Sequence, residues 1–99
     1  MTVIGQFEKQ GDRYSGLITT RLFTAKVHIV PNPDKASEDA PDYRLITANG
    51  AEVGAAWAVT AKGSGQEYLN VKLADPHMPS PVYARLVRTR DGYALIWNA

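Results

Sequence analysis

The stretch that most constrains the fold of this chain is residues 66–97, where apolar and polar residues alternate. Leu69, Val71 and Leu73 are separated by polar residues, and Val82, Ala84 and Leu86 repeat the spacing. In an extended chain, residues two apart share one face of the sheet. The pattern therefore predicts two strands that bury one common face, and it excludes a long helix from this stretch.

Turn signals divide the remainder of the chain into short segments. Asn49-Gly50 and Asp91-Gly92 are typical of hairpin turns, because these residues accept a positive φ. Gly5 and Gly16 predict a bulge or a close crossing within the strands that contain them. Strands are expected at residues 2–9, 14–20, 22–30, 42–48, 51–60, 67–73, 82–87 and 93–97.

These segments predict an all-β fold, a single small antiparallel barrel or sandwich of about eight short strands spanning residues 1–99. Ala25, Val27 and Ile29 are expected to point inward. Val3, Gly5 and Phe7 are expected to share one face, as are Val53, Ala55, Trp57 and Val59. Trp57 and Trp97 fall on apolar alternating faces and are assigned to the core; the alternative is that either is a surface anchor that a partner buries. If Leu95 and Trp97 point inward, Ile96 lies outside or is covered by a partner.

Composition narrows the possible classes of function. The 99 residues are 44% hydrophobic and 21% charged, and they include no cysteine, which excludes a disulfide framework and a thiolate site. The first nine residues do not predict a signal peptide, and no apolar run reaches the length of a membrane span, so a soluble, cytoplasmic protein is expected. The net charge of +1 argues against a chain whose main role is to bind phosphates.

Several longer stretches carry a family resemblance. They are IGQF (residues 4–7), VPN (30–32), SEDAPDYR (37–44), VGAAW (53–57), YLNVKLADP (68–76), PVYARL (81–86) and LIW (95–97). Together they make the chain similar to the bacterial family DUF736 from end to end. The resemblance implies a small cytoplasmic protein encoded near conjugation or plasmid-maintenance genes. It implies no catalytic residues, because none is established for that family.

The strongest candidate site is an outward sheet face that combines aromatic rings with cations. Single-stranded nucleic acid is often held on such a face, because bases stack on rings and cations meet phosphates. The alternative is a solvated face whose tyrosines cover neighbouring side chains. The residues assigned to this nucleic-acid or partner-binding face by alternation are Lys26, His28, Tyr68, Lys72, Tyr83 and Arg85.

Other constellations point to structural roles. The acidic residues of the segment 31–42 could gather a hard cation, but their spacing matches no known calcium loop, and a solvated loop with at most one helical turn near residues 35–39 is favoured. Asp42 is expected to accept backbone N–H bonds, and Arg44 to pair with an acid. His28 and His77 are the only histidines, too few for a zinc site.

No nucleophile elbow and no phosphate-binding loop is present, so neither catalytic residues nor cofactors are predicted. The proline-rich loop at residues 76–81, which contains Met78, is either a docking point or a rigid connection between strands.

The leading functional prediction is a non-enzymatic accessory binding protein of a mobile-element or conjugation system, with a protein partner or a homo-oligomer. Exposed strand edges and the small residues 54–58 motivate the oligomer. The alternative is single-stranded nucleic-acid binding through Tyr68, Lys72, Tyr83 and Arg85. An enzyme with an unrecognised site is the third and weakest reading.

Overall fold

The computed structural model describes residues 2–20, 24–76 and 78–97, and these residues form strands and loops but no helix. The strands are β1 (Thr2–Gln10), β2 (Arg13–Thr19), β3 (Thr24–Pro31), β4 (Tyr43–Thr47), β5 (Glu52–Thr60), β6 (Glu67–Leu73), β7 (Val82–Thr89) and β8 (Gly92–Trp97). In the described part of the chain, no helix is long and apolar enough to cross a membrane.

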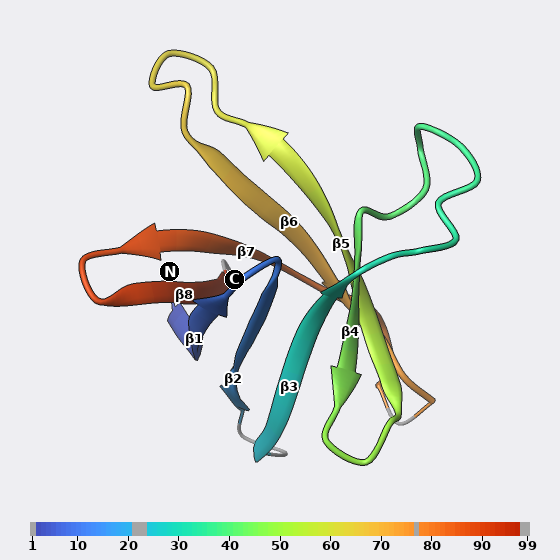
Figure 1. The fold of residues 1–99 in the computed structure, drawn as a ribbon. Coiled ribbons are helices and arrows are strands. Elements are labelled where there is room, and N and C mark those ends of the chain that lie inside the picture. The colour runs from blue at the N-terminus through green and yellow to red at the C-terminus, as the bar shows by residue number, and fades with distance from the viewer. Residues whose placement is uncertain (1, 21–23, 77, 98–99) are drawn as a thin grey trace.

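The strands form one closed barrel in which each strand pairs antiparallel with the next along the chain (Figure 1). β8 returns to pair with β1, with Phe7 opposite Tyr93 and Gln6 opposite Ala94. This pairing decides between the two predicted architectures in favour of the barrel, and it leaves none of the described strands with a free edge. Strand pairing with a partner is therefore no longer a reason to expect an oligomer.

Alternation correctly predicts the core residues of β3, β6 and β7. Leu69 faces Leu86 and Val71 faces Ala84 across β6 and β7, and all four are buried. From β3, Val27 and Ile29 are buried, while Lys26 and His28 point outward as predicted. The largest fully buried side chains are Ile18, Ile29, Leu45, Leu73, Leu86, Leu95, Val27 and Val71.

Two strand pairs approach more closely than a side chain would allow. A Cβ atom on Gly16 would lie 1.9 Å from the carbonyl oxygen of Gln6, and one on Gly54 would lie 2.3 Å from that of Lys72. Only glycine fits at such positions. The predicted close crossing at Gly16 is confirmed, and Gly54 makes a second close approach of the same kind.

A bulge in β1 changes which residues face the core. The register with β8 shifts between Val3 and Gly5, so that Ile4 is the additional residue. Ile4 is 8% exposed, whereas Val3 lies opposite Ile96 and is 52% exposed. The prediction that Val3 shares a face with Gly5 and Phe7 was therefore wrong, because alternation does not continue through a bulge.

The inward face of β5 was also predicted wrongly. Gly54 and the fully buried Ala56 point inward, opposite Leu73 and Val71, and Trp57 points outward. Of the predicted set, Val53 packs partly against the core. The large side chains of the neighbouring strands fill the interior here, so only small residues fit on β5. Trp97 shares the inward direction of Leu95 but sits at the last position of β8 and remains 38% exposed.

Both predicted hairpins form, with turns that differ from the expected type. Gly50 has a φ of 90°, but β4 and β5 are joined by four residues rather than two. The β7–β8 turn is Arg90-Asp91, and Gly92 already pairs with Thr89. The segment near residues 35–39, where at most one helical turn was expected, forms no helix and contains a turn closed by a hydrogen bond from the Ala40 N–H to the Ser37 carbonyl.

We predict that Gly16→Ala destabilises the barrel by about 3 kcal/mol, because the new methyl group collides with backbone that cannot rotate away. Urea unfolding monitored by far-ultraviolet circular dichroism measures the change. Gly63→Ala is the matched control, since nothing lies within 4 Å of that position and only its φ of 91° is strained, at a cost of about 1 kcal/mol. A Gly16 variant no less stable than the Gly63 variant would contradict the close approach.

A candidate binding face on strands β5–β8

Four of the six predicted site residues come together on the outer surface of β6 and β7. Lys72 lies directly opposite Tyr83, and Arg85 lies opposite Asn70, because these two strands are paired. Tyr68 is one position further along the same side of β6. A shared site requires that the strands carrying these residues be neighbours, which the sequence does not show. The structure places Tyr68, Lys72, Tyr83 and Arg85 on two paired strands.

On this surface Tyr83 and Arg85 are exposed, whereas Tyr68 and Lys72 are half-buried. The Arg85 guanidinium lies over the Tyr68 ring, with 5.2 Å between Cζ and the ring centroid, a cation–π distance. Tyr83 is 65% exposed. Among the described residues, neither Lys72 nor Arg85 forms an ion pair.

A shallow groove of about 520 Å³ runs across the same surface. Trp57 of β5 and Ile96 of β8 border it on either side of the cations, in a row that continues from Trp57 through Asn70 and Arg85 to Ile96. The groove is lined by Trp57, Asn70, Val71, Lys72, Tyr83, Ala84, Arg85 and Ile96. We call this groove, together with Tyr68, the β5–β8 face. Chemically it offers flat rings for stacking and two cations for anionic groups.

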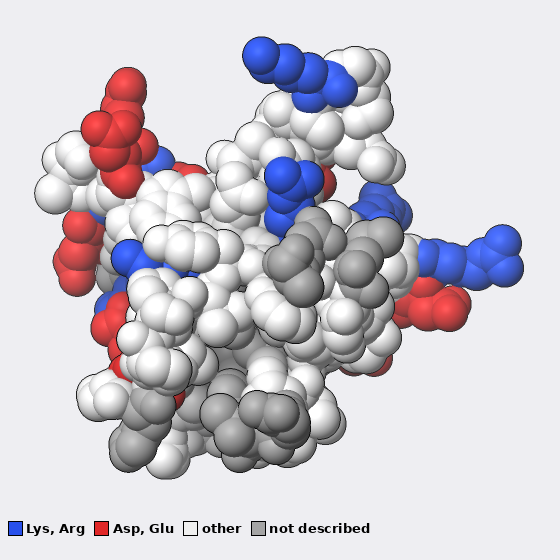
Figure 2. All heavy atoms as spheres, turned by 180° about the vertical axis from the view of Figure 1, so that it is seen from behind, with Lys and Arg blue, Asp and Glu red and all other residues white. Residues whose placement is uncertain are grey.

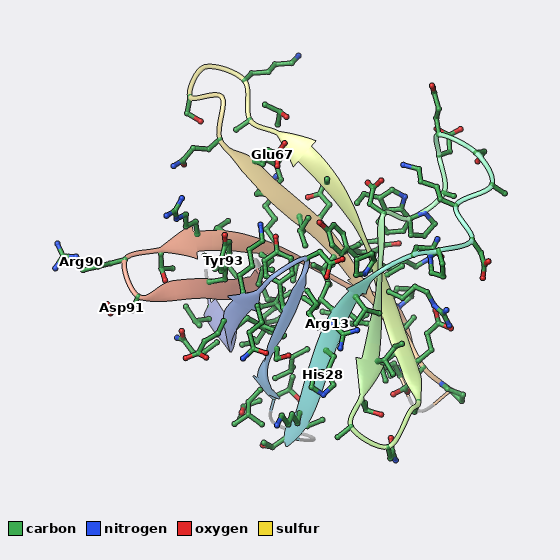
Figure 3. All side chains as sticks on the ribbon, in the orientation of Figure 1. Arg13, His28, Glu67, Arg90, Asp91 and Tyr93 are labelled. Carbon is green, nitrogen blue, oxygen red and sulfur yellow. The ribbon has the colours of Figure 1, made fainter. Side chains whose placement is uncertain are left out.

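The other two predicted residues, Lys26 and His28, lie elsewhere. Both are on β3, which the closed strand order separates from β6 and β7. Figure 3 shows His28 on β3, well away from the β7–β8 turn marked by Arg90 and Asp91. His28 Nδ1 is 2.9 Å from Ser15 Oγ on the neighbouring strand, a structural hydrogen bond. Lys26 borders a second shallow groove of about 420 Å³ near the β4–β5 loop.

The acidic loop, residues 32–42, is fastened to the edge of the β5–β8 face. Its base is closed by hydrogen bonds from Asn32 N to Asp42 O (3.0 Å) and from Asn32 Nδ2 to Pro41 O (2.9 Å). The Trp57 indole N–H donates to the Asp39 carbonyl at 3.0 Å. Trp57 therefore both borders the groove and holds the loop beside it.

Asp42 and Arg44 have the structural roles that were predicted for them. The Asp42 carboxylate accepts the Ala58 N–H at 2.9 Å and pairs with Lys35, and these contacts, Lys35 first, hold its pKa below the usual value. Arg44 pairs with Glu52 at 3.1 Å, which raises the pKa of the guanidinium.

The described residues contain no group of three or more histidine or acidic side chains placed to hold a metal ion. Figure 2 shows acidic side chains gathered on the side where the β3–β4 loop projects, while single cations protrude at other edges. His77 lies outside the described residues. Met78 packs against the hydrophobic core, which favours a rigid connection over a docking point for the proline-rich loop.

Three tyrosines meet at one end of the barrel interior. The Tyr14 ring contacts those of Tyr93 and Tyr43 edge-on, at centroid distances of 5.0 and 5.9 Å, and Lys9 Nζ lies 5.6 Å from its centroid. Burial, followed by the neighbouring Tyr43 and Tyr93, raises the pKa of Tyr14 to about 12. Since Tyr14 is 7% exposed, this cluster belongs to the core and not to an open site.

Alternation alone did not identify Trp57 and Asn70 as part of the face. Trp57 was assigned to the core because both sides of β5 are apolar or small. The side that carries the larger apolar residues, Trp57 among them, was therefore taken as the inward one. Alternation places Asn70 on the same side of β6 as Lys72. Asn70 was not included in the site because a single amide side chain does not by itself indicate a binding function. Ile96 was noted as lying outside or being covered by a partner, and it borders the groove.

A scan against protein-family models matches residues 3–99 to "Protein of unknown function (DUF736)". The chain belongs to the DUF736 family. The match confirms the resemblance seen in the sequence, and it covers every residue of the β5–β8 face. Searches of curated proteins and of solved structures found no match to this DUF736 chain.

We predict that the barrel loses stability above pH 10, because folding favours protonated Tyr14. Its pKa rises on folding from 10.0 to about 12, so its stabilising contribution is complete below pH 10 and is lost as pH rises towards 12. The loss is about 2 kcal/mol. The urea midpoint of Tyr14→Phe, measured by circular dichroism, should fall less than that of the unchanged protein between pH 9 and pH 11.5. Parallel curves would refute the role of Tyr14.

Proposed function

We propose that this protein is a non-enzymatic binding protein that contacts other polypeptides through the β5–β8 face. The observation that carries the proposal is one groove in which exposed aromatic and aliphatic surface surrounds two cations without ion-pair partners among the described residues. Tryptophan, tyrosine and arginine are the residues that most often dominate protein interfaces. Trp57, Tyr83 and Arg85 supply all three within this groove.

Charge favours a polypeptide over a polyphosphate at this surface. The chain carries a net charge of only +1, and the acidic loop lies at the groove's edge, tied there by the Trp57–Asp39 hydrogen bond. Carboxylates beside the groove would repel a phosphate backbone. A protein segment can instead match both the cations and the apolar rings.

The cellular setting is part of the same proposal. The resemblance to DUF736 supports a bacterial, cytoplasmic protein that serves a mobile-element or conjugation system as an accessory. A rigid barrel with a side-chain binding surface suits that role, because little conformational entropy is lost when such a surface docks.

The test is site-specific photocrosslinking in the native cells. We expect the photoreactive residue p-benzoylphenylalanine, introduced in place of Tyr83, to form a discrete protein adduct, because position 83 lies at the groove and is exposed. Gel electrophoresis and mass spectrometry measure the adduct. Adding Arg85→Glu should abolish it by reversing one of the two groove charges.

The matched control places the same photoreactive residue at Arg13, which is exposed at the start of β2 (Figure 3). No adduct at position 83, or the same adducts from positions 83 and 13, would overturn the proposal.

Single-stranded nucleic acid is the second candidate, favoured by one specific observation. Lys72 faces Tyr83 across paired strands, and Arg85 packs on Tyr68, so cations and stacking rings alternate along one surface. The exposed Tyr83 ring would be the first stacking platform.

For this second candidate we predict that a labelled oligonucleotide binds at low salt and that binding weakens steeply as salt rises. Tyr83→Ala should lose about 1–3 kcal/mol of binding free energy, whereas Lys26→Ala, on β3, should change little. Fluorescence anisotropy measures both. Absence of binding at about 50 mM salt, or equal effects of the two variants, would eliminate nucleic acid as the ligand.

A further inference from the structure

We infer that the partner of the β5–β8 face is a second copy of this chain, docked so that the acidic loop of each copy lies on Lys72 and Arg85 of the other. This inference rests on the proposed function, because it names the polypeptide that the face binds. It follows from charges of both signs that lie close to one another on the barrel without being paired within it.

The acidic loop supplies the negative charges of this contact. Its carboxylates at Asp34, Glu38 and Asp39 are exposed and form no ion pair with any described residue. Asp42, by contrast, is paired with Lys35. Asp34 also interacts electrostatically with Arg44, so Glu38 and Asp39 are the carboxylates most available to a partner.

The groove supplies the positive charges of this contact. Its Lys72 and Arg85 likewise form no ion pair with any described residue. Within one copy the loop cannot turn over onto them, because the Trp57–Asp39 and Asp42–Ala58 hydrogen bonds fasten it at the edge of β5. The same contacts hold the loop backbone at Asp39 and Asp42 in place, which lowers the entropy cost of docking.

A two-fold axis between two copies would pair the acidic loop of each copy with the cationic groove of the other. In such an interface each surface patch meets its own copy, so cations at the centre of a face and carboxylates at its edge complement themselves. The closed barrel rules out dimerisation by strand addition at the described strands, so the contact must be made by side chains. Tyr83, at 65% exposure, and Val3, at 52% and opposite Ile96, supply apolar surface for it to bury.

The test is sedimentation of the purified chain with its charges reversed. The unchanged protein should form a species of twice 10.8 kDa that dissociates as salt rises. Lys72→Glu with Arg85→Glu, or Glu38→Lys with Asp39→Lys, should each weaken dimerisation by about tenfold or more through like-charge contact. Mixing the two variants should restore dimers, because opposite charges then face each other in both of the paired contacts.

The matched control is Arg13→Glu, which changes an exposed cation outside the face and should leave the dimer unchanged. Circular dichroism establishes that every variant is folded. A monomer at all concentrations, a dimer indifferent to both charge reversals, or a mixture that fails to associate would overturn the inference. The proposed function is tested separately: a Tyr83 adduct to a different protein would support it while contradicting self-association.

Discussion

The pairing of β1 with β8 is the interaction on which the rest of the molecule depends. It closes an eight-stranded sheet, among the described residues, into a barrel and gives the backbone groups of both terminal strands partners that water would otherwise supply. The pairing needs a bulge at Ile4, which curves β1 toward β8. On the other side of β1, β2 packs closely because Gly16 has no Cβ to collide with the Gln6 carbonyl.

Closure determines what kind of surface the protein can offer. Because no described strand has a free edge, recognition rests on side chains and projecting loops. In the middle of β5 the crowded interior takes the small Gly54 and Ala56, and Trp57 is directed outward. There its ring borders the groove and its N–H holds the acidic loop. One packing constraint inside the barrel thus places both components of the proposed interface.

The sequence predicts the fold well where alternation is uninterrupted. Leu69, Val71, Leu86 and their neighbours are buried as expected, because each faces another apolar residue across a regular ladder. The prediction failed at Val3 and Trp57. At Val3 a bulge reverses the alternation, and at β5 both faces are apolar or small, so the inner face is decided by the volume that other strands occupy.

Alternation also predicted part of the candidate site, namely the four residues on β6 and β7. Alternation gives the side of the sheet on which a residue lies, and Tyr68, Lys72, Tyr83 and Arg85 also belong to consecutive strands, which most often pair. Lys26 and His28 have the same outward direction, but the barrel's curvature turns β3 to another side of the molecule. Whether a side chain points into or out of the barrel is set by the local sequence. Its distance around the barrel from another side chain depends on all the strands that lie between the two.

Amide hydrogen exchange, followed residue by residue by nuclear magnetic resonance, tests the central claim of closure most directly. The account predicts that the amides of Phe7 and Leu95, on the two strands that close the barrel, exchange as slowly as that of Val71 on β6. Exchange in β1 or β8 at the rate of an unpaired edge strand, with β6 and β7 protected, would contradict the closed barrel and the binding face derived from it.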